Sequence, residues 1–252
     1  MSASDFYDAM APFYHLIYPN WEESIRRQTA LLDTIIHDYW GGQVHSILDV
    51  SCGIGTQSLG LAQLGYQLTA SDLSAASIAR AKAEAQRRHL AIRFSVADMR
   101  EVFRHHAQPF DLVISCDNAV PHLLSDDDIR QALEQFYQCT RPGGGSLISV
   151  RDYEQEMRTG VEVQPYGVRD DESARYLVFQ VREWHGSHYD VAMYFVEDRG
   201  GTACTTEVTR GQYYAIPIDR LLTLMREAGF VDVQRLDDRY VQPILMGRKS
   251  AA

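Results

Sequence analysis

An apolar stretch that runs into a glycine turn is the first part of the sequence whose residue types could do chemistry. Residues 47–56 read ILDVSCGIGT, so the chain passes from apolar residues through Asp49 into a turn with Gly53 and Gly55. Glycines allow positive φ and let a bound molecule approach the backbone closely. Asp72 ends the next apolar stretch, where a carboxylate can accept hydrogen bonds from both hydroxyls of a ribose. These residues predict a site for a nucleoside.

Two other interpretations of the same residues compete with this one. A nicotinamide dinucleotide would use the same ribose carboxylate, but its glycine fingerprint needs a glycine where this chain has Ser58. A carboxylate at the end of the strand would also repel the pyrophosphate of a dinucleotide, whereas it would attract a ligand that carries a cationic amino-acid portion. The acids can instead serve structure alone, with Asp49 capping a turn and Asp72 capping a helix that begins near Ser74.

Short apolar runs alternate with amphipathic stretches from Ile47 onward, and these elements must position the site. The pattern predicts helices at residues 57–64, 75–89 and 126–139 and strands at 46–50, 67–71, 92–96, 111–115 and 146–150, with a turn at 141–145. Strands that alternate with helices form parallel sheets covered on both faces. Ligands of such sheets bind at the carboxyl ends of the strands, where Asp49 and Asp72 are expected.

The alternation stops after residue 150. Three consecutive strands, predicted at residues 176–184, 189–197 and 205–214, indicate an antiparallel meander. A helix at 217–229 and strands at 231–236 and 241–249 then resume the earlier pattern. The predicted fold class is α/β, a doubly wound and mostly parallel seven-stranded sheet with an inserted antiparallel meander. The expected segments are an N-terminal helical and aromatic lid (1–45), a ligand-binding α/β core (46–150), an inserted β cap (151–215) and the C-terminal part of the core (216–252).

Composition limits the class of partner. The chain has 252 residues, of which 45% are hydrophobic, so it can bury a large core. Its net charge of −10 argues against a nucleic acid or an anionic membrane, because either partner needs a surface rich in Lys and Arg. A small molecule remains the expected partner, and the sequence does not indicate an oligomeric state.

Cysteine usage and the N-terminus bear on the compartment. The four cysteines form no CxxC pair and none lies at zinc-ligand spacing from a histidine, so we expect no metal site and a reducing, cytoplasmic environment. Residues 1–18 lack the basic start and apolar stretch of a signal peptide. No apolar run approaches the roughly 20 residues that span a bilayer.

Together the motifs resemble those of class I S-adenosylmethionine-dependent methyltransferases. Residues 49–55, DVSCGIG, are similar to the glycine-rich first motif, although a glycine commonly stands at the position of Ser51. Residues 110–116, FDLVISC, resemble the fourth-strand motif, and residues 141–145, RPGGG, resemble the turn before the fifth strand. The likeness is close over residues 45–150 and loose over 215–249.

This resemblance implies S-adenosyl-L-methionine as the cofactor. By the family pattern, Asp72 binds the ribose, Asp98 lies near the adenine amino group and Met99 packs on the ring. The implied cofactor-binding residues are Tyr14, Arg27, Asp49, Ser51, Gly53, Gly55, Asp72, Leu73, Asp98, Met99 and Cys116.

The segments after the fourth and fifth strands are similar to those of the glycine/sarcosine N-methyltransferase group. By that likeness, Asn118 hydrogen-bonds the methyl acceptor and Arg151 clamps its carboxylate, which suits the bidentate geometry of a guanidinium. An ion pair of Arg151 with Asp152, Glu154 or another acid is the structural alternative. The likeness implies N-methylation of a small amine or amino acid such as glycine or sarcosine. O-methylation of a small carboxylate or hydroxyl metabolite, or a non-catalytic protein that binds the cofactor, remain open.

Aromatic residues and one histidine complete the predicted site. The N-terminal segment is also similar to that group, with Arg27 matched to the cofactor's carboxylate and with Tyr14 and Tyr18 beside the sulfonium, where aromatic rings favour a cation. Packing on the core is the alternative for both tyrosines. His122 is a candidate general base, with a purely structural role as the alternative. Candidate wall residues from the meander are Tyr166, Tyr194, Arg210 and Tyr213, with an outward-facing position on the strand as the alternative for each.

Overall fold

Seven strands form sheet A, the centre of the molecule, in a computed structural model that describes residues 2–155, 159–171 and 174–251. The order is β10-β11-β5-β4-β1-β2-β3. The strands are β1 (Ser46–Asp49), β2 (Gln67–Asp72), β3 (Arg93–Val96), β4 (Phe110–Ser115), β5 (Thr140–Ser149), β10 (Val231–Leu236) and β11 (Ile244–Arg248). All neighbours are parallel except β11, which is antiparallel to both β5 and β10. The predicted doubly wound, mostly parallel sheet is therefore confirmed.

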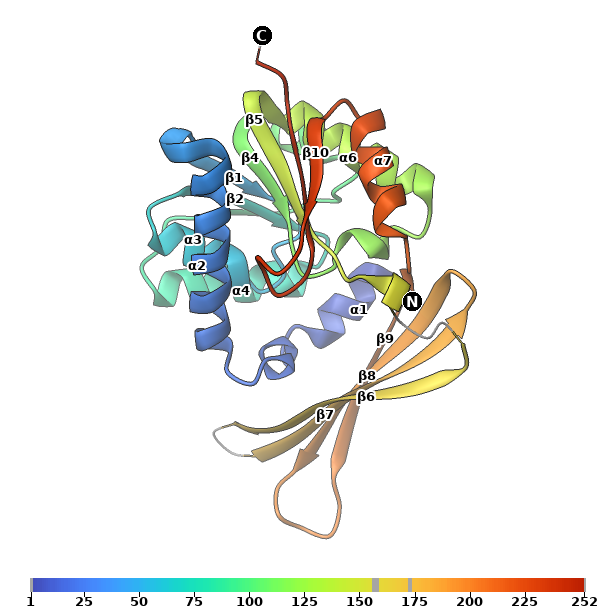
Figure 1. The fold of residues 1–252 in the computed structure, drawn as a ribbon. Helices are drawn as coiled ribbons and strands as arrows, with labels where there is room; N and C mark the ends of the chain where they lie inside the picture. The colour runs from blue at the N-terminus through green and yellow to red at the C-terminus, as the bar shows by residue number, and fades with distance from the viewer. Residues whose placement is uncertain (1, 156–158, 172–173, 252) are drawn as a thin grey trace.

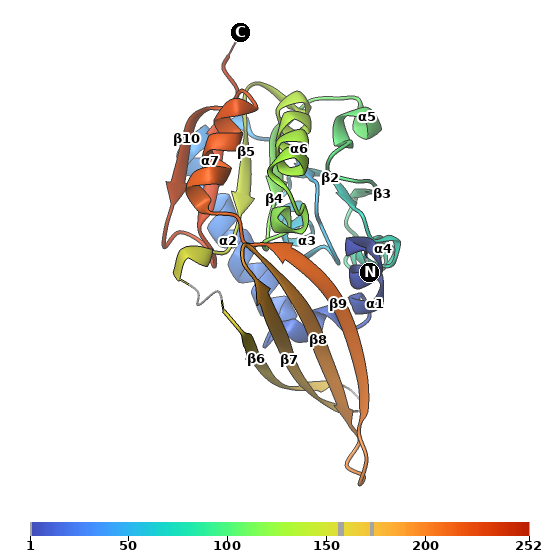
Figure 2. The same cartoon turned by 90° about the vertical axis from the view of Figure 1, so that its right-hand side faces the viewer.

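Helices cover both faces of sheet A (Figures 1 and 2). One face carries α2 (Trp21–Trp40), α3 (Thr56–Gln63) and α4 (Ala75–Arg87), and the other carries α5 (Val102–His106), α6 (Asp126–Cys139) and α7 (Ile218–Glu227). Because side chains alternate along a strand, Ile47 packs in the cluster with α2 while its neighbour Leu48 packs with α6 and α7. Both are fully buried, as expected for a central strand of a sheet that is covered on both faces.

The strand order reverses between β1 and β4, which are hydrogen-bonded neighbours. The helix after β1 lies on one face of the sheet and the helix that follows β4 lies on the other. The connections therefore diverge at the carboxyl ends of these two strands and leave a crevice between them. This is the place at which ligands of doubly wound sheets bind.

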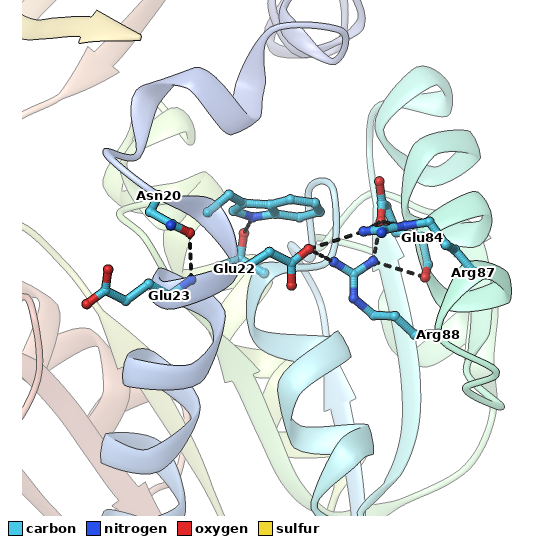
Figure 3. Close-up of polar contacts among 8 residues, drawn as sticks. Asn20, Glu22, Glu23, Glu84, Arg87 and Arg88 are labelled. Carbon is cyan, nitrogen blue, oxygen red and sulfur yellow. Dashed lines mark hydrogen bonds and ion pairs between the residues drawn. The ribbon is translucent and has the colours of Figure 1, made fainter. Parts of the chain in front are cut away.

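Polar contacts fix the start of α2 beside the first turn of α3. The Asn20 side chain caps α2 by accepting from the backbone N–H of Glu23, and Glu22 forms ion pairs with Arg87 and Arg88 at the end of α4 (Figure 3). The Trp21 indole Nε1–H donates to Thr56 Oγ1 at 2.9 Å. The segment before α2 is thereby held against the glycine turn.

Sheet B is a second, antiparallel sheet in the order β6-β7-β8-β9. Its strands are β6 (Val161–Asp171), β7 (Ala174–His185), β8 (His188–Asp198) and β9 (Thr205–Tyr214). The predicted meander of three strands is present, but β6 was not expected. The reason is that Pro165 and Gly167 interrupt its pattern, and the structure accommodates them in a register shift between these residues.

The N-terminal residues lie between the two sheets (Figures 1 and 2). They form α1 (Ala3–Met10) and the short 3-10 helix η1 (Tyr14–Ile17); the other 3-10 helices are η2 (Gly41–Gln43), η3 (Val120–His122) and η4 (Tyr153–Gln155). Helix α1 begins with a capping box between Ser2 and Asp5, and its Phe6 and Met10 are buried against sheet B. Within the described residues, no helix combines the length and the apolar character needed to cross a membrane.

The break predicted at residues 141–145 lies within β5, which already begins at Thr140, rather than before it. The register of β5 against β4 jumps from Thr140 to Gly145, and Gly143 has a φ of 79°. The next two glycines also allow close packing within the strand. A Cβ on Gly144 would lie 2.4 Å from the carbonyl oxygen of Asp111, and one on Gly145 would lie 2.4 Å from the Trp40 ring. Lacking side chains, these residues let β5 pass close to its neighbours.

We predict that Gly144→Ala destabilises the protein by about 1–3 kcal/mol, because the added methyl group overlaps a backbone carbonyl that cannot rotate away. The free energy of unfolding in urea measures the effect. Gly42→Ala is the matched control, since no atom lies within 4 Å of its added Cβ, and it should change stability by less than about 0.5 kcal/mol. Equal stability of the two variants would contradict the packing argument.

Candidate active site

The glycine turn after β1 has the geometry that its sequence predicts. Gly53 and Gly55 have φ of 52° and 97°, a region that side chains disfavour. A Cβ on Gly53 would lie 3.0 Å from a ring carbon of Tyr14, so the N-terminal segment approaches the turn closely. The turn therefore needs glycine both for its backbone angles and for its contact with Tyr14.

Asp72 lies across from this turn at the end of β2. Its Oδ2 accepts from Gly53 N at 2.8 Å and its Oδ1 accepts from Ser74 N at 2.9 Å. Burial raises the pKa of Asp72, and these two backbone donors oppose that shift. The N-cap of α4 is Ser74 rather than Asp72, because the Ser74 side chain accepts from Ser77 N, and Asp72 fixes the backbone just before that cap. Each carboxylate oxygen of Asp72 keeps a further lone pair for a ligand.

A cavity opens beside these residues, which we call the strand-end cavity. It is bounded by the carboxyl ends of β1, β2 and β4 and by the segment after β3. Eight predicted cofactor-binding residues line it: Tyr14, Ser51, Gly53, Asp72, Leu73, Asp98, Met99 and Cys116. Ser2, Ala3 and Tyr7 also line it, so the start of α1 forms part of its wall.

Asp49 and Gly55, by contrast, lie beneath the strand-end cavity. Asp49 is only 1% exposed, and its carboxylate accepts from Ser58 Oγ at 2.7 Å and from Ser51 N at 3.3 Å. Burial raises the pKa of Asp49 to about 7 despite these donors. Gly55 packs against Leu59 of α3. Both residues therefore shape the turn from below, as the structural interpretation of Asp49 required.

Asp98 is held by an arginine that the sequence did not single out. Arg100 Nη2 lies 2.6 Å from Asp98 Oδ2, and its Nη1 lies 2.9 Å from Asp128 at the start of α6. Burial acts to raise the pKa of Asp98, but the hydrogen bonds from Arg100 outweigh it and lower the pKa below its ordinary value. Asp98 therefore stays ionised at the edge of the cavity.

A second cavity, the inter-sheet cavity, lies between sheet A and sheet B. Predicted site residues that line it are Tyr14, Tyr18, Arg27, Asn118, Arg151, Tyr166 and Tyr213. Arg27 thus faces this cavity rather than the strand-end cavity. Three residues, Tyr7, Tyr14 and Asp117, line both cavities, so the two meet at these side chains.

Tyr194 and Arg210 are not part of this wall. They line a shallow hollow that also includes Glu183, Asp190 and Gln212. Residues 189, 191 and 193 of β8 face the inter-sheet core, so the alternation of the strand places Tyr194 and its partner strand's Arg210 on the opposite face. Their prediction as wall residues was wrong, because the sequence does not tell which face of a strand is covered.

Asn118 braces the segment that carries Arg151. Its Oδ1 accepts from Arg151 N at 3.0 Å and its Nδ2 donates to the Tyr153 hydroxyl at 2.7 Å. Asn118 itself has φ of 64°, and Ser149 O accepts from its backbone N–H. The amide is therefore largely engaged within the protein, and it fixes where the Arg151 backbone lies in the inter-sheet cavity.

His122 lies in the wall of the strand-end cavity and contacts α1 and sheet B. Its Nε2 is 2.7 Å from the Tyr7 hydroxyl, and its ring lies 3.9 Å from that of Tyr213 between centroids. Burial lowers the pKa of His122 to about 3, so the imidazole is neutral at neutral pH and a weak base. Tyr7, which joins these elements, was not predicted as a site residue although it stands in the aromatic N-terminal run.

Among the described residues, no group of three or more His, Cys, Asp or Glu side chains is placed to hold a metal ion. Carboxylates and aromatic rings, which are groups that favour an organic cation, line the two cavities.

Asp117 is one of these carboxylates and lies two residues after the end of β4. Sequence reasoning passed over it because Cys116 and Asn118 on either side matched the family pattern.

The sheet order, the glycine turn and the acids at the strand ends define a class I methyltransferase fold. Residues 47–144 match the family model described as a methyltransferase domain. This part of the chain therefore matches a methyltransferase domain, the class that the sequence motifs predicted.

Curated relatives and solved structures extend this likeness. The glycine/sarcosine N-methyltransferase of Aphanothece halophytica is 32% identical over 108 residues, 43% of this chain and 41% of the relative. The malonyl-(acyl-carrier protein) O-methyltransferase of Salmonella typhimurium is 31% identical over 136 residues, 54% of this chain and 51% of the relative. DesVI of Streptomyces venezuelae has the same fold, with a TM-score of 0.82 at 17% identity over 95% of this chain and 98% of DesVI. The chain spans about two fifths of the length of the glycine/sarcosine relatives that it matches.

We predict that Asp72→Asn weakens the binding of S-adenosylmethionine by about 10- to 100-fold. Hydrogen bonds to a charged group contribute about 1.5–3 kcal/mol, and the amide cannot accept from the backbone and from both ribose hydroxyls at once. Titration calorimetry measures the dissociation constant. Asp190→Asn, an exposed acid on the far face of sheet B, is the control and should bind as the parent does. An unchanged affinity in Asp72→Asn would show that the nucleoside lies elsewhere.

Proposed function

We propose that this protein transfers a methyl group from S-adenosylmethionine to a nitrogen of a small amine or amino acid such as glycine or sarcosine. The observation that carries the proposal is the meeting of the strand-end and inter-sheet cavities at Tyr7, Tyr14 and Asp117. Methyl transfer from a sulfonium is an in-line displacement. The protein must therefore hold the donor and the acceptor on opposite sides of the methyl group that is transferred. Two adjoining cavities with a shared wall meet that requirement.

On the donor side, the residues of the strand-end cavity suit a nucleoside with a cationic end. When bound, S-adenosylmethionine supplies an activated methyl group on its sulfonium. Asp72 would accept from the ribose hydroxyls and Asp98 would lie near the adenine. Tyr14 presents its ring at the junction, where an aromatic face favours a cation. Arg27, in the inter-sheet cavity, would pair with the carboxylate of the methionine portion.

On the acceptor side, the inter-sheet cavity offers Arg151 as a partner for a carboxylate. Tyr18, Tyr166 and Tyr213 add hydroxyl groups to the same walls. Asn118 contributes by holding the Arg151 segment in place. Such a lining favours a small acceptor that carries both an anionic group and polar atoms.

The likeness to an O-methyltransferase supports oxygen as the alternative nucleophile. A panel of acceptors separates the two, with S-adenosylhomocysteine formation as the readout. We expect activity with glycine, sarcosine or β-alanine and none with glycolate. Activity with glycolate alone would favour O-methylation. Cofactor binding without turnover of any acceptor would point to a non-catalytic binding protein.

The choice of cofactor can be checked separately by thermal unfolding. A ligand at 100 times its dissociation constant stabilises the folded state by about 2.7 kcal/mol. S-adenosylmethionine and S-adenosylhomocysteine should raise the melting temperature, whereas NAD should not. Stabilisation by NAD alone would contradict the proposed function at its first step.

We predict that Arg151→Ala raises the KM for sarcosine by about 10- to 100-fold while the KM for methylamine changes little. The loss of hydrogen bonds between charged groups costs about 1.5–3 kcal/mol, and methylamine has no carboxylate to lose them. Arg210→Ala is the matched control, since Arg210 faces away from the inter-sheet cavity. Equal effects of Arg151→Ala on both amines would argue against a carboxylate clamp.

A further inference from the structure

Asp117 carries a carboxylate to the point where the two cavities meet. It follows β4 at the strand-order reversal and lines both the strand-end and the inter-sheet cavity. Within residues 2–155, 159–171 and 174–251, no Lys, Arg or His lies close enough to form an ion pair with it. A half-buried negative charge without a cation in the protein is unfavourable unless a ligand supplies one.

The backbone holds Asp117 in this place at some cost. Asp117 and Asn118 have φ of 56° and 64°, two consecutive left-handed residues without a glycine. Ser149 stabilises the turn, because its Oγ accepts from Asp117 N at 2.8 Å and its carbonyl accepts from Asn118 N at 3.1 Å. Sparsely populated backbone conformations of this kind persist where they position a functional side chain.

Hydrogen bonds orient the carboxylate through one of its two oxygens. Tyr18 Oη and Gln57 Nε2 donate to Oδ2 at 2.8 and 3.0 Å, and Gln57 is itself fixed by Gln28 and Tyr240. No donor from the part of the chain that the structure describes reaches Oδ1. An asparagine oxygen would satisfy the same two donors, so what the aspartate adds at this position is negative charge.

The groups around Asp117 do not neutralise it. Its titratable neighbours are acids or neutral groups at physiological pH: Asp49, Cys116, Tyr14, Tyr18 and Tyr240. Arg27 and Arg151 line the same inter-sheet cavity without forming an ion pair with Asp117. A molecule in this cavity therefore meets a carboxylate at the junction and guanidinium groups further along its walls.

We propose that Asp117 binds the ammonium group of the acceptor and accepts a proton from it before methyl transfer. This inference rests on the proposed function and narrows its substrate class to zwitterions, with the ammonium at Asp117 and the anionic group at Arg151. The two side chains line one cavity and carry opposite charges. An amino acid, with its ammonium and carboxylate groups, is complementary to this arrangement.

The chemical step balances with the groups named. An N–H bond of the ammonium breaks, its proton passes to Asp117 Oδ1, and the electron pair stays on nitrogen. The nitrogen then forms a bond to the methyl carbon, the carbon–sulfur bond breaks, and its electrons remain on sulfur as a neutral thioether. Asp117 returns its proton to water. Burial raises the pKa of Asp117, although the hydrogen bonds from Tyr18 and Gln57 oppose the shift, and a raised pKa makes the carboxylate a better proton acceptor.

The test compares Asp117→Asn, Asp117→Glu and the control Asp190→Asn in the full chain. The asparagine keeps an acceptor for Tyr18 and Gln57 and removes the charge. We expect kcat/KM for sarcosine to fall by about 100-fold or more, with a raised KM, because both binding and proton transfer are lost. The parent's kcat/KM should rise with pH as the carboxylate ionises, and Asp117→Asn should lack that rise. Asp117→Glu should recover part of the activity.

Binding of S-adenosylmethionine, measured by titration calorimetry, separates the possible roles. An Asp117→Asn protein that binds it within about threefold of the parent supports an acceptor-binding role. Weaker cofactor binding with an unchanged KM for sarcosine would overturn the proposal, since Asp117 would then serve the cofactor. Unchanged KM and pH profile would overturn it as well. A parent enzyme that binds S-adenosylmethionine but methylates no amine would instead refute the proposed function itself.

Discussion

Backbone N–H groups that donate to two carboxylates hold the turn on which the rest of this site depends. The Asp49 carboxylate, below the turn, accepts a hydrogen bond from the backbone N–H of Ser51. The Asp72 carboxylate, across from the turn, accepts one from the backbone N–H of Gly53. These hydrogen bonds stabilise the positive φ angles of the glycine segment, and that conformation leaves a cavity at the strand ends. Both acids thus act first on the protein's own backbone, and the remaining lone pairs of Asp72 face the strand-end cavity only because that backbone is already fixed.

Sequence reasoning reached sheet A and the strand-end cavity because both follow from local patterns. Apolar runs locate the strands, and the acids at their ends are then placed at one edge whatever the details of packing. It could not separate Asp49, buried under the turn, from Ser51 two residues later, which lines the cavity. That distinction depends on the direction of each side chain, which only the tertiary structure sets.

The inter-sheet cavity was less predictable because its walls come from segments far apart in the chain. Tyr166 and Tyr213 were expected in the wall and line it, whereas Tyr194 and Arg210 lie on the uncovered face. Helix α1 gave no clear signal, since its role is to fill the gap between the sheets rather than to cover one of them. Sequence reasoning missed Asp117 because what distinguishes this residue is that it lines both cavities, and only the tertiary structure shows that.

Sheet B contributes side chains to the inter-sheet cavity, but none of its described residues lines the strand-end cavity. Substitutions in β6 to β9 can therefore reshape the one cavity while the lining of the other is conserved. The architecture separates two kinds of evolutionary change, because the residues around the strand-end cavity lie on a different part of the chain. Under the proposed function, a single α/β scaffold of this type can diversify its acceptors by varying one inserted sheet.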